Sequence, residues 1–447
     1  MSIGKLFGKV FENVTIESAG TEGMSLARID GQVCFVKYGV PGDVADIKLY
    51  AKKKKVLFAE IQTLIKPGKD RVTPFCSHFG TCGGCKWQQM DYQAQLSWKN
   101  QHVIDAFERI GKVQCETWEP IVGGENDRYY RNKLEYAFSN QRWLTFDEMK
   151  AGAVADNAAG FHIAGRFDKI LNIEQCFLQD DRGNQIRNFV RDYAIQNHID
   201  FYDVKAQTGF LRNLMIRNTS TEQWMLVLIV GRDEPEILNP LLEQMLVNFP
   251  FITSLVYGVN GKVNDAIYDI ELHTFFGPDY IEEDLDGLRF RIRPKSFFQT
   301  NTKQALKLYN LVAEYAGLTG KENVYDLYCG TGSITLFLAR YAQKVTGIES
   351  VPQAIEDAHE NATQNGISNV SFLVGDMRYL FNDQFIENSG FPDVIITDPP
   401  RAGMHGDVVE QLLKIASHKI VYVSCNPATQ ARDLALLESK YRIVKTR

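Results

Sequence analysis

Two side chains able to take part in covalent chemistry follow separate candidate strands near the end of the sequence. Cys425 closes the stretch VYVSC and precedes Pro427, a residue that suits the first turn of a helix. The positive end of a helix favours the thiolate, which is the nucleophilic form of cysteine. Asp398 closes the stretch IITD, and two prolines and Arg401 follow it. A free cysteine is often a buried packing residue. The presence of Asp398 at the end of the preceding strand is what favours a catalytic role for Cys425.

A thiolate beside a carboxylate suits a carbon atom that needs activation, such as carbon 5 of uracil. Addition of a thiolate to carbon 6 turns carbon 5 into an enolate-like nucleophile, which is the general logic of covalent catalysis. Asp398 could bond the uracil edge or the amino-acid part of a methyl donor. Arg401 could pair with an RNA phosphate, polarise the base or be a simple surface charge. An enzyme that methylates amino groups would also carry an Asp-Pro-Pro loop, usually followed by an aromatic residue, and needs no cysteine.

The segment Val324–Ala339 has the composition of a strand, a glycine turn and a helix that bind a nucleotide cofactor. Gly330 and Gly332 allow a tight turn and a close approach of the backbone to a ligand. Glu349 ends the next candidate strand, where an acid can accept hydrogen bonds from ribose hydroxyls. Asp376 follows the strand after that, where it could meet an adenine amino group or form a turn. The three spaced glycines of dinucleotide loops are missing, which favours S-adenosylmethionine over NAD.

A parallel sheet is the element that would bring these residues together. Candidate strands cover residues 323–328, 344–348, 370–374, 394–397 and 420–424, and helices begin near residues 333, 352, 407 and 427. Regular alternation of this kind predicts an α/β, Rossmann-like methyltransferase domain with helices on both faces of the sheet. In open sheets of parallel strands the active site lies at the carboxyl ends of the strands, where all the candidate residues fall.

A separate cluster of cysteines indicates a metal centre. Cys76, Cys82 and Cys85 are spaced C-x5-C-x2-C among glycines that let the backbone wrap closely round a metal. The C-x2-C pair is also half of a zinc site, so zinc is an alternative. Four thiolates suit a [4Fe–4S] cluster, and Cys176 is our candidate for the fourth ligand, with His78 as runner-up. We favour the cluster.

The beginning of the chain differs in pattern from the rest. Residues 1–67 carry short apolar segments punctuated by glycine, which predicts a five-stranded OB-like β-barrel. The stretch from Thr21 to Gly31 and the turn GVPGD resemble a TRAM domain, an RNA-binding barrel. We place an α+β central domain at 68–285 and the methyltransferase domain at 286–447. The barrel also carries the run Lys52, Lys53, Lys54 and Lys55, which could contact phosphates.

Composition sets broad limits on the class of protein. The 447 residues suffice for two or three domains, and 45% hydrophobic and 23% charged residues are ordinary for a globular protein. No apolar run of membrane-spanning length and no secretory signal appears, so we expect a cytoplasmic protein. A net charge of −6 does not indicate nucleic-acid binding. Locally, however, Arg128, Arg131 and Lys133 alternate with tyrosines, a pattern that suits single-stranded RNA.

Four motifs in sequence order resemble the RNA 5-methyluridine methyltransferase family: KSFFQTN, DLYCGTG, DPPRAG and VSCNPAT, within residues 294–433. By that resemblance the positions that contact cofactor or substrate are Gln299, Tyr328, Glu349 and Asp398, and Cys425 is the nucleophile. Iron–sulfur members of the family show the same cysteine spacing plus one distant cysteine. A barrel combined with a cluster resembles the members that act on 23S ribosomal RNA. We therefore expect a monomer that methylates 23S rRNA, with transfer RNA as the alternative.

One departure from the family concerns the base that removes the proton from carbon 5. Family members continue into a segment with a glutamate for this step, whereas this sequence ends at residues 441–447 without a matching glutamate. We expect a truncated chain with slow release of the covalent adduct. A catalytically impaired RNA-binding protein is the non-enzymatic alternative. A radical methylthiotransferase would need a C-x3-C-x2-C motif and a C-terminal TRAM domain, and the sequence has neither.

Overall fold

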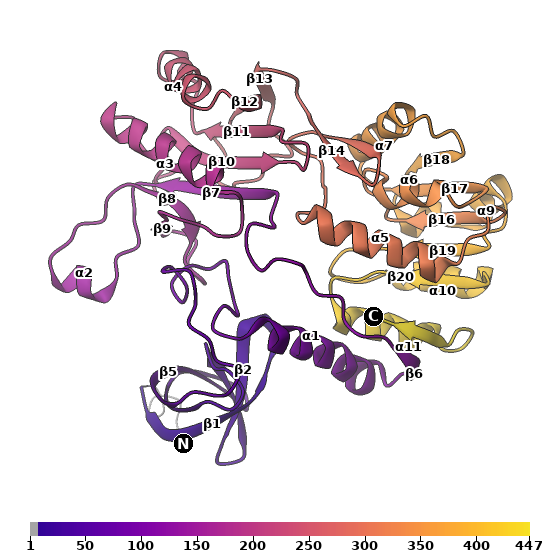
Figure 1. Ribbon diagram of the computed structural model, residues 1–447, viewed down its shortest axis with the longest axis horizontal. Coiled ribbons are helices and arrows are strands. Elements are labelled where there is room, and N and C mark those ends of the chain that lie inside the picture. Colours follow the sequence, from indigo (N-terminus) through magenta and orange to yellow (C-terminus); the bar gives the residue numbers. More distant parts are fainter. Residues whose placement is uncertain (1–7) are drawn as a thin grey trace.

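The computed structural model describes residues 8–447, and its first element group is a closed β-barrel (Figure 1). Its strands are β1 (Val10–Ala19), β2 (Met24–Ile29), β3 (Gln32–Lys37), β4 (Val44–Lys53) and β5 (Val56–Lys66), in the order β1-β2-β3-β5-β4. Alternate residues point inward, so small and branched side chains such as Ala27, Val36 and Ile47 fill the interior. The prediction of a five-stranded barrel is confirmed.

The lysine run forms the tip of the hairpin between β4 and β5. Lys52 and Lys53 end β4, Lys54 adopts a left-handed φ of 53°, and Lys55 leads into β5. Three of the four side chains are exposed and Lys52 is half-buried. The run therefore stands at one end of the barrel as a compact positive patch.

The central part of the chain is a seven-stranded sheet with α3 and α4 on one side, whereas α2 lies on a loop that extends away from it (Figure 1). Its strands lie in the order β13-β12-β11-β10-β7-β8-β9. They are β7 (Lys133–Ser139), β8 (Ala158–His162), β9 (Ile170–Asn172), β10 (Leu211–Asn218), β11 (Trp224–Val230), β12 (Ile252–Val259) and β13 (Leu272–Phe276). The helices are α2 (Phe146–Lys150), α3 (Asp181–Gln196) and α4 (Pro235–Asn248). Every residue of β11 is buried, which explains its unbroken apolar sequence WMLVLIV.

The last part is a five-stranded parallel sheet in the order β18-β17-β16-β19-β20. The strands are β16 (Asn323–Leu327), β17 (Lys344–Glu349), β18 (Val370–Val374), β19 (Val394–Thr397) and β20 (Lys419–Tyr422). The helices are α5 (Thr302–Ala316), α6 (Ser333–Ala339), α7 (Pro352–Gln364), α8 (Met377–Leu380), α9 (Asp383–Ser389), α10 (Gly406–Ile415) and α11 (Pro427–Leu437). The predicted Rossmann-like fold is confirmed, and each strand lies where the sequence pattern places it.

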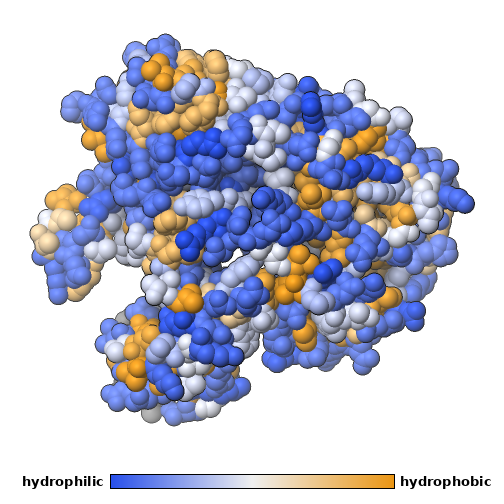
Figure 2. Space-filling view, viewed as in Figure 1, coloured by the Kyte–Doolittle hydropathy of each residue, from blue (hydrophilic) through white to orange (hydrophobic). Residues whose placement is uncertain are grey.

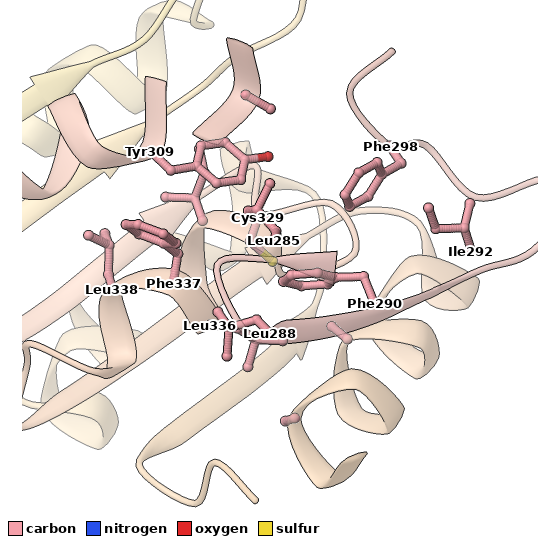
Figure 3. Packing of buried hydrophobic residues seen from close by; sticks show 14 of the residues in the cluster. Leu285, Leu288, Phe290, Ile292, Phe298, Tyr309, Cys329, Leu336, Phe337 and Leu338 are labelled. Carbon is pink, nitrogen blue, oxygen red and sulfur yellow. The ribbon is translucent and has the colours of Figure 1, made fainter. Parts of the chain in front are cut away.

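A hairpin of β14 (Ile281–Leu285) and β15 (Leu288–Ile292) joins the two sheets and spans the position where we place a domain boundary. Its apolar side chains belong to the core of the last sheet: Figure 3 shows Leu285 and Phe290 packed beside Cys329. The amides of Arg289 and Arg291 donate to Asn365 and Asn361 of α7. The hairpin is therefore fixed to the five-stranded parallel sheet and its helix α7 on both its apolar and its polar side.

Segments far apart in sequence also join near the end of the chain (Figure 1). Helix α1 (Tyr92–Ala106) continues into a π-helical turn, Phe107–Gly111, that packs against α11. Strand β21 (Ile443–Thr446) pairs in parallel with β6 (Cys115–Trp118) and not with the five-stranded sheet. Within residues 8–447, the helices are all too short or too polar to cross a membrane.

Candidate active site

The candidate residues gather at one edge of the last sheet because its five strands run parallel. Tyr328 follows β16, Glu349 ends β17, and Asp398 follows β19 directly. Cys425 comes three residues after the end of β20. The strand order reverses direction between β16 and β19, and crevices at such switch points are where open α/β sheets bind ligands. The site therefore lies over β16, β19 and their neighbours.

The cofactor loop is tied to the acid of the next strand. The backbone N–H of Gly330 donates to Oε2 of Glu349 at 3.2 Å, and Oε1 accepts from the amides of Ser350 and Val351. Gly332 has a φ of +77°, and a Cβ there would lie 3.0–3.1 Å from Ala358 and Phe372. Both the turn and the close helix contact require glycine at this position.

Tyr328 adopts a left-handed backbone, with a φ of 67°. Such a conformation is costly for a large residue other than glycine, and strain of this kind is common at functional sites. The side chain is half-buried, and burial raises the pKa of its phenol to about 12. Tyr328 is therefore a neutral, constrained ring beside the cofactor loop.

Two carboxyl groups of the site, the buried Asp326 and the half-buried Asp398, have raised pKa values. Asp326 is fully buried, Thr335 donates to its Oδ2 at 2.6 Å, and no donor among residues 8–447 reaches its Oδ1. Burial raises its pKa to about 7, with Asp398 and Glu349 adding repulsion. Burial also raises the pKa of Asp398 to about 6. The site thus concentrates acidic groups that a positively charged ligand would stabilise in their ionised form.

The Cys425 side chain is exposed at the same edge. Asn426 caps α11, because its side chain accepts from the amide of Ala428 at 3.1 Å. The same side chain donates to the carbonyl oxygen of Arg401 at 3.1 Å. The loop that carries Asp398 and the loop that carries Cys425 are therefore in direct contact.

Other predicted residues lie around this centre with different surroundings. Gln299 is half-buried, and its carbonyl oxygen accepts from Asn132 at 3.0 Å. Arg401 is exposed. Asp376 forms a close ion pair with Arg378, which lowers the pKa of the aspartate to about 2. Asp376 would have to exchange this partner in order to meet an adenine amino group.

The segment with interleaved arginines and tyrosines lies between the cysteines and the site. The guanidinium of Arg128 lies 4.0 Å from the centre of the Phe75 ring, and Tyr129 and Tyr130 are exposed. Asn132, which belongs to the same run, fixes the far end of this segment: its amide donates to the carbonyl of Thr300 at 2.8 Å, and its side chain to Thr302. These contacts join residues far apart in the sequence, so no local pattern predicts them.

The remaining basic residues of this segment are partly engaged. The ammonium of Lys133 lies 2.6 Å from a carboxylate oxygen of Glu135, and burial lowers its pKa. Arg131 donates to the carbonyl of Lys133 and lines the cavity that holds the cysteines. Of the three basic side chains, Arg128 is the most open to a ligand.

All four predicted cysteine ligands line one cavity of about 220 Å³: Cys76, Cys82, Cys85 and Cys176. Burial raises the pKa of the Cys82 thiol to about 11 and also raises the pKa values of Cys85 and Cys176. His78 also lines the cavity, but its Nε2 accepts from the amide of Glu174. Within the described chain, no three His, Cys, Asp or Glu side chains lie close enough together to hold a single metal ion.

Comparison with known proteins agrees with this architecture. The family described as tRNA (Uracil-5-)-methyltransferase matches residues 271–447, and the TRAM domain family matches residues 8–61. The chain is 51% identical over 427 residues to an uncharacterized RNA methyltransferase of Bacteroides thetaiotaomicron, covering 94% of each protein. It is 48% identical to another from Porphyromonas gingivalis, covering 97% of this chain and 95% of that protein.

A solved structure is similar over nearly the whole length. The tRNA (uracil-54, C5)-methyltransferase of Pyrococcus abyssi, in complex with S-adenosyl-L-homocysteine, superposes with a TM-score of 0.72 at 26% identity. The match covers 95% of this chain and 93% of that protein. The chain belongs to the TRAM-containing RNA uracil-5-methyltransferase family, whose members are S-adenosylmethionine-dependent enzymes.

Proposed function

We propose that this enzyme methylates carbon 5 of a uridine in RNA with Cys425 as the covalent nucleophile and Asp398 as the residue that holds the base. The observation that carries this proposal is the contact between the two loops at the ends of β19 and β20. Asn426, next to the thiol, is bonded to the loop of Asp398 through the carbonyl of Arg401. A base seated between these loops meets a thiol and a carboxylate at once.

The proposed reaction begins at carbon 6 of the uracil ring. The Cys425 thiolate forms a bond to carbon 6, and the electrons of the 5,6 double bond move to carbon 5 and the neighbouring carbonyl. When bound, S-adenosylmethionine would supply the methyl group that carbon 5 attacks, with cleavage of the sulfonium–methyl bond and release of S-adenosylhomocysteine. A base then removes the proton from carbon 5, the double bond forms again, and the thiolate leaves. Asp398 accepts a hydrogen bond from the N3–H of uracil, which orients the ring for both steps.

The residues around the cofactor loop fit S-adenosylmethionine. Glu349 presents its carboxylate at the end of β17, where it can accept from ribose hydroxyls, and Gly330 lets the backbone approach the ligand. The positive charges of this cofactor would stabilise the ionised forms of the buried Asp326 and the half-buried Asp398. Tyr328, which follows β16 directly, and Gln299, in the motif KSFFQTN, are the further residues that we propose to contact this ligand.

RNA is proposed to lie across the hydrophilic hollow between the barrel and the sheets (Figure 2). The exposed rings of Tyr129 and Tyr130 can stack on unpaired bases, and Arg128 and Arg401 can pair with phosphates. The lysine run at the tip of the hairpin between β4 and β5 adds positive charge that can bind phosphates of RNA of any base sequence. A base that reacts at the sheet edge must leave its stack, which suits a surface of this type.

Two RNA classes remain as substrates, and different observations favour each. A barrel together with a cysteine cluster favours 23S rRNA, as the sequence motifs predict. The Pyrococcus abyssi protein, by its name, acts on uracil 54 of tRNA, and its structure matches 95% of the present chain. The barrel alone therefore does not separate the two.

We further propose that the four cysteines hold a [4Fe–4S] cluster. Zinc bound by thiolates holds its sulfurs within about 4 Å of one another, because each Zn–S bond is about 2.3 Å long. The wider cavity of about 220 Å³, without a close group for one ion in the described chain, suits the larger cluster. The amide of Gly84 lies 3.4 Å from the sulfur of Cys82, a contact that stabilises a thiolate bound to iron.

Deletion of the gene, followed by mapping of 5-methyluridine in ribosomal and transfer RNA by mass spectrometry, tests the proposed function. We expect one 5-methyluridine of 23S rRNA to be lost, and to return with the wild-type gene but not with a Cys425→Ala variant. Loss from transfer RNA would replace the rRNA assignment and keep the chemistry. Unchanged 5-methyluridine in both RNA classes would contradict the proposal.

A further inference from the structure

The loop Asp398–Met404, here named the acid loop, is fastened to helix α11 by side chains of the helix. The carbonyl oxygen of Arg401 accepts from Asn426 at 3.1 Å and from the hydroxyl of Thr429 at 3.2 Å. The carbonyl oxygen of Ala402 accepts from Arg432 at 3.0 Å. The acid loop is thus bonded to the N-cap residue of α11 and to two residues of the helix, at positions spaced three residues apart along one side.

Asp433 lies beneath these contacts and is fully buried. Its Oδ2 accepts from the backbone N–H of Met404 at 2.8 Å and from the phenol of Tyr422 at 2.6 Å. Its Oδ1 accepts from Nε and Nη2 of Arg432, at 2.8 and 2.6 Å. One carboxylate therefore joins the acid loop, the end of β20 and α11. Removal of a partner from such a buried, charged network is costly.

Gly403 shows how closely the acid loop sits on this network. Its φ is +81°, and a Cβ at this position would lie 2.5 Å from Nη2 of Arg432 and 2.6 Å from Oδ2 of Asp433. A side chain here would have to displace the network or lift the loop. The acid loop can lie this close to Asp433 and Arg432 only because residue 403 is a glycine.

We propose that Asp433 is a positioning residue that fixes the acid loop against the Cys425 loop, so that Asp398 and Cys425 meet the same base. This inference rests on the proposed roles of those two residues. Asp433 is buried away from solvent and so acts through the acid loop and not on the substrate. A shift of the acid loop by about 1 Å would be enough to lower the rate about 100-fold, because reacting groups tolerate little misplacement.

The test compares Asp433→Asn with Glu438→Gln, which removes one charge at the exposed end of the same helix. Three quantities are measured on the purified enzyme: the single-turnover rate of methyl transfer to RNA, the Kd of S-adenosylhomocysteine, and hydrogen exchange of the amides of residues 401–404. For Asp433→Asn we expect a rate about 100-fold lower, an unchanged Kd and faster exchange at Met404. Glu438→Gln should match wild type in all three.

A wild-type rate for Asp433→Asn would overturn the proposal, and so would unchanged exchange of the acid loop. A Kd that rises by the same factor as the rate falls would indicate a merely structural role and would also overturn it. Tyr422→Phe removes one hydrogen bond to Asp433 and keeps the ring, so it serves if Asp433→Asn does not fold; we expect a rate about tenfold lower.

The assignment of Cys425 as the nucleophile and the assignment of Asp433 as a positioning residue can be disproved independently of each other. Full methyl transfer by Cys425→Ala would remove the thiol from the mechanism. The exchange of the acid loop and the rate of Asp433→Asn would still decide whether Asp433 positions Asp398.

Discussion

Burial brings the pKa values of two carboxyl groups, Asp326 and Asp398, into the range of ordinary assays, and Asp398 is the one that we propose to contact the base. Its position directly after the buried strand β19 removes water from its carboxyl group, and burial raises its pKa to about 6. Below that pH the group is protonated and cannot accept a hydrogen bond from the N3–H of uracil. The rate of methyl transfer should therefore depend on the charge of Asp398.

We expect the single-turnover rate of the wild-type enzyme to fall as the pH drops through about 6. Asp398→Asn should lose most of the rate and should not show this acidic limb. Glu387→Gln, which changes an exposed acid on α9, should keep both the rate and the limb. An unchanged acidic limb in Asp398→Asn would assign the titration to another group.

The stability of the folded chain should depend on pH in the opposite direction to the rate of methyl transfer. The pKa of Asp398 is higher in the folded chain than in an unfolded one, so the folded state binds this proton more tightly. The protonated form of Asp398 therefore stabilises the folded chain below its ordinary pKa of 3.8, and this stabilisation is lost as the pH rises from there through about 6. Asp398→Asn should raise the Tm at pH 7.5 and change it less at pH 5, as measured by calorimetry; an equal change at both pH values would contradict this.

At the scale of elements, the cysteine-bearing loop joins three parts of the molecule. Tyr38 of the barrel donates to the carbonyl of Gly80 at 2.7 Å and packs edge-on against Phe79. On the side of the loop away from the barrel, Arg131 lines the cavity that holds the cysteines. The next residue, Asn132, donates to the carbonyl oxygen of Gln299 and so connects this segment to the methyltransferase domain. A metal centre here would hold the barrel and the RNA-facing segment in one arrangement.

Metal content tests this element directly. Anaerobically purified wild type should contain about four irons per chain, as a [4Fe–4S] cluster requires. Cys82→Ser and Cys176→Ser should lose the iron, whereas Cys115→Ser should keep it because Cys115 lies far away on β6. His78→Ala should also keep it. Zinc as the only metal, or loss of iron from His78→Ala with iron retained in Cys176→Ser, would contradict the assignment.

Much of this arrangement can be predicted from local sequence. Glycine-punctuated strands specify the barrel, and alternating strands and helices specify the parallel sheet that brings Asp398 and Cys425 together. The network of Asp433 with Tyr422 and Met404 could not be predicted, because it depends on side chains that meet only after the strands pair. The same holds for Asn132, which acts through atoms of residues 299–302.

At the scale of the whole molecule, contacts between distant segments fix the domains. Strand β21 pairs with β6, across more than three hundred residues, and Tyr315 of α5 donates to Glu119 beside it at 2.7 Å. No periodicity in the sequence indicates such a pairing, so it was not predicted. The pairing of β21 with β6 lies beside the contacts of α1 and its π-helical turn with α11. Together these contacts attach α1, which follows the cysteine-bearing loop, to the methyltransferase domain.

The barrel should add affinity for RNA without adding specificity for sequence. Replacement of Lys52, Lys53, Lys54 and Lys55 by glutamine should weaken RNA binding most at low salt. For single-stranded RNA, each lost phosphate contact should reduce the slope of log K against log salt by about 0.7. The Kd of S-adenosylhomocysteine should not change. An unaltered salt slope, measured by fluorescence anisotropy, would place the RNA elsewhere on the molecule.

The central claim is that Cys425 forms a covalent bond to the target base. RNA with 5-fluorouridine at the target position tests it, because fluorine at carbon 5 cannot be removed as a proton and the adduct is trapped. With S-adenosylmethionine, wild type and Cys115→Ser should form a complex that survives denaturing electrophoresis. Cys425→Ala should form none while it still binds S-adenosylhomocysteine. A stable complex with Cys425→Ala, or none with wild type, would contradict the account.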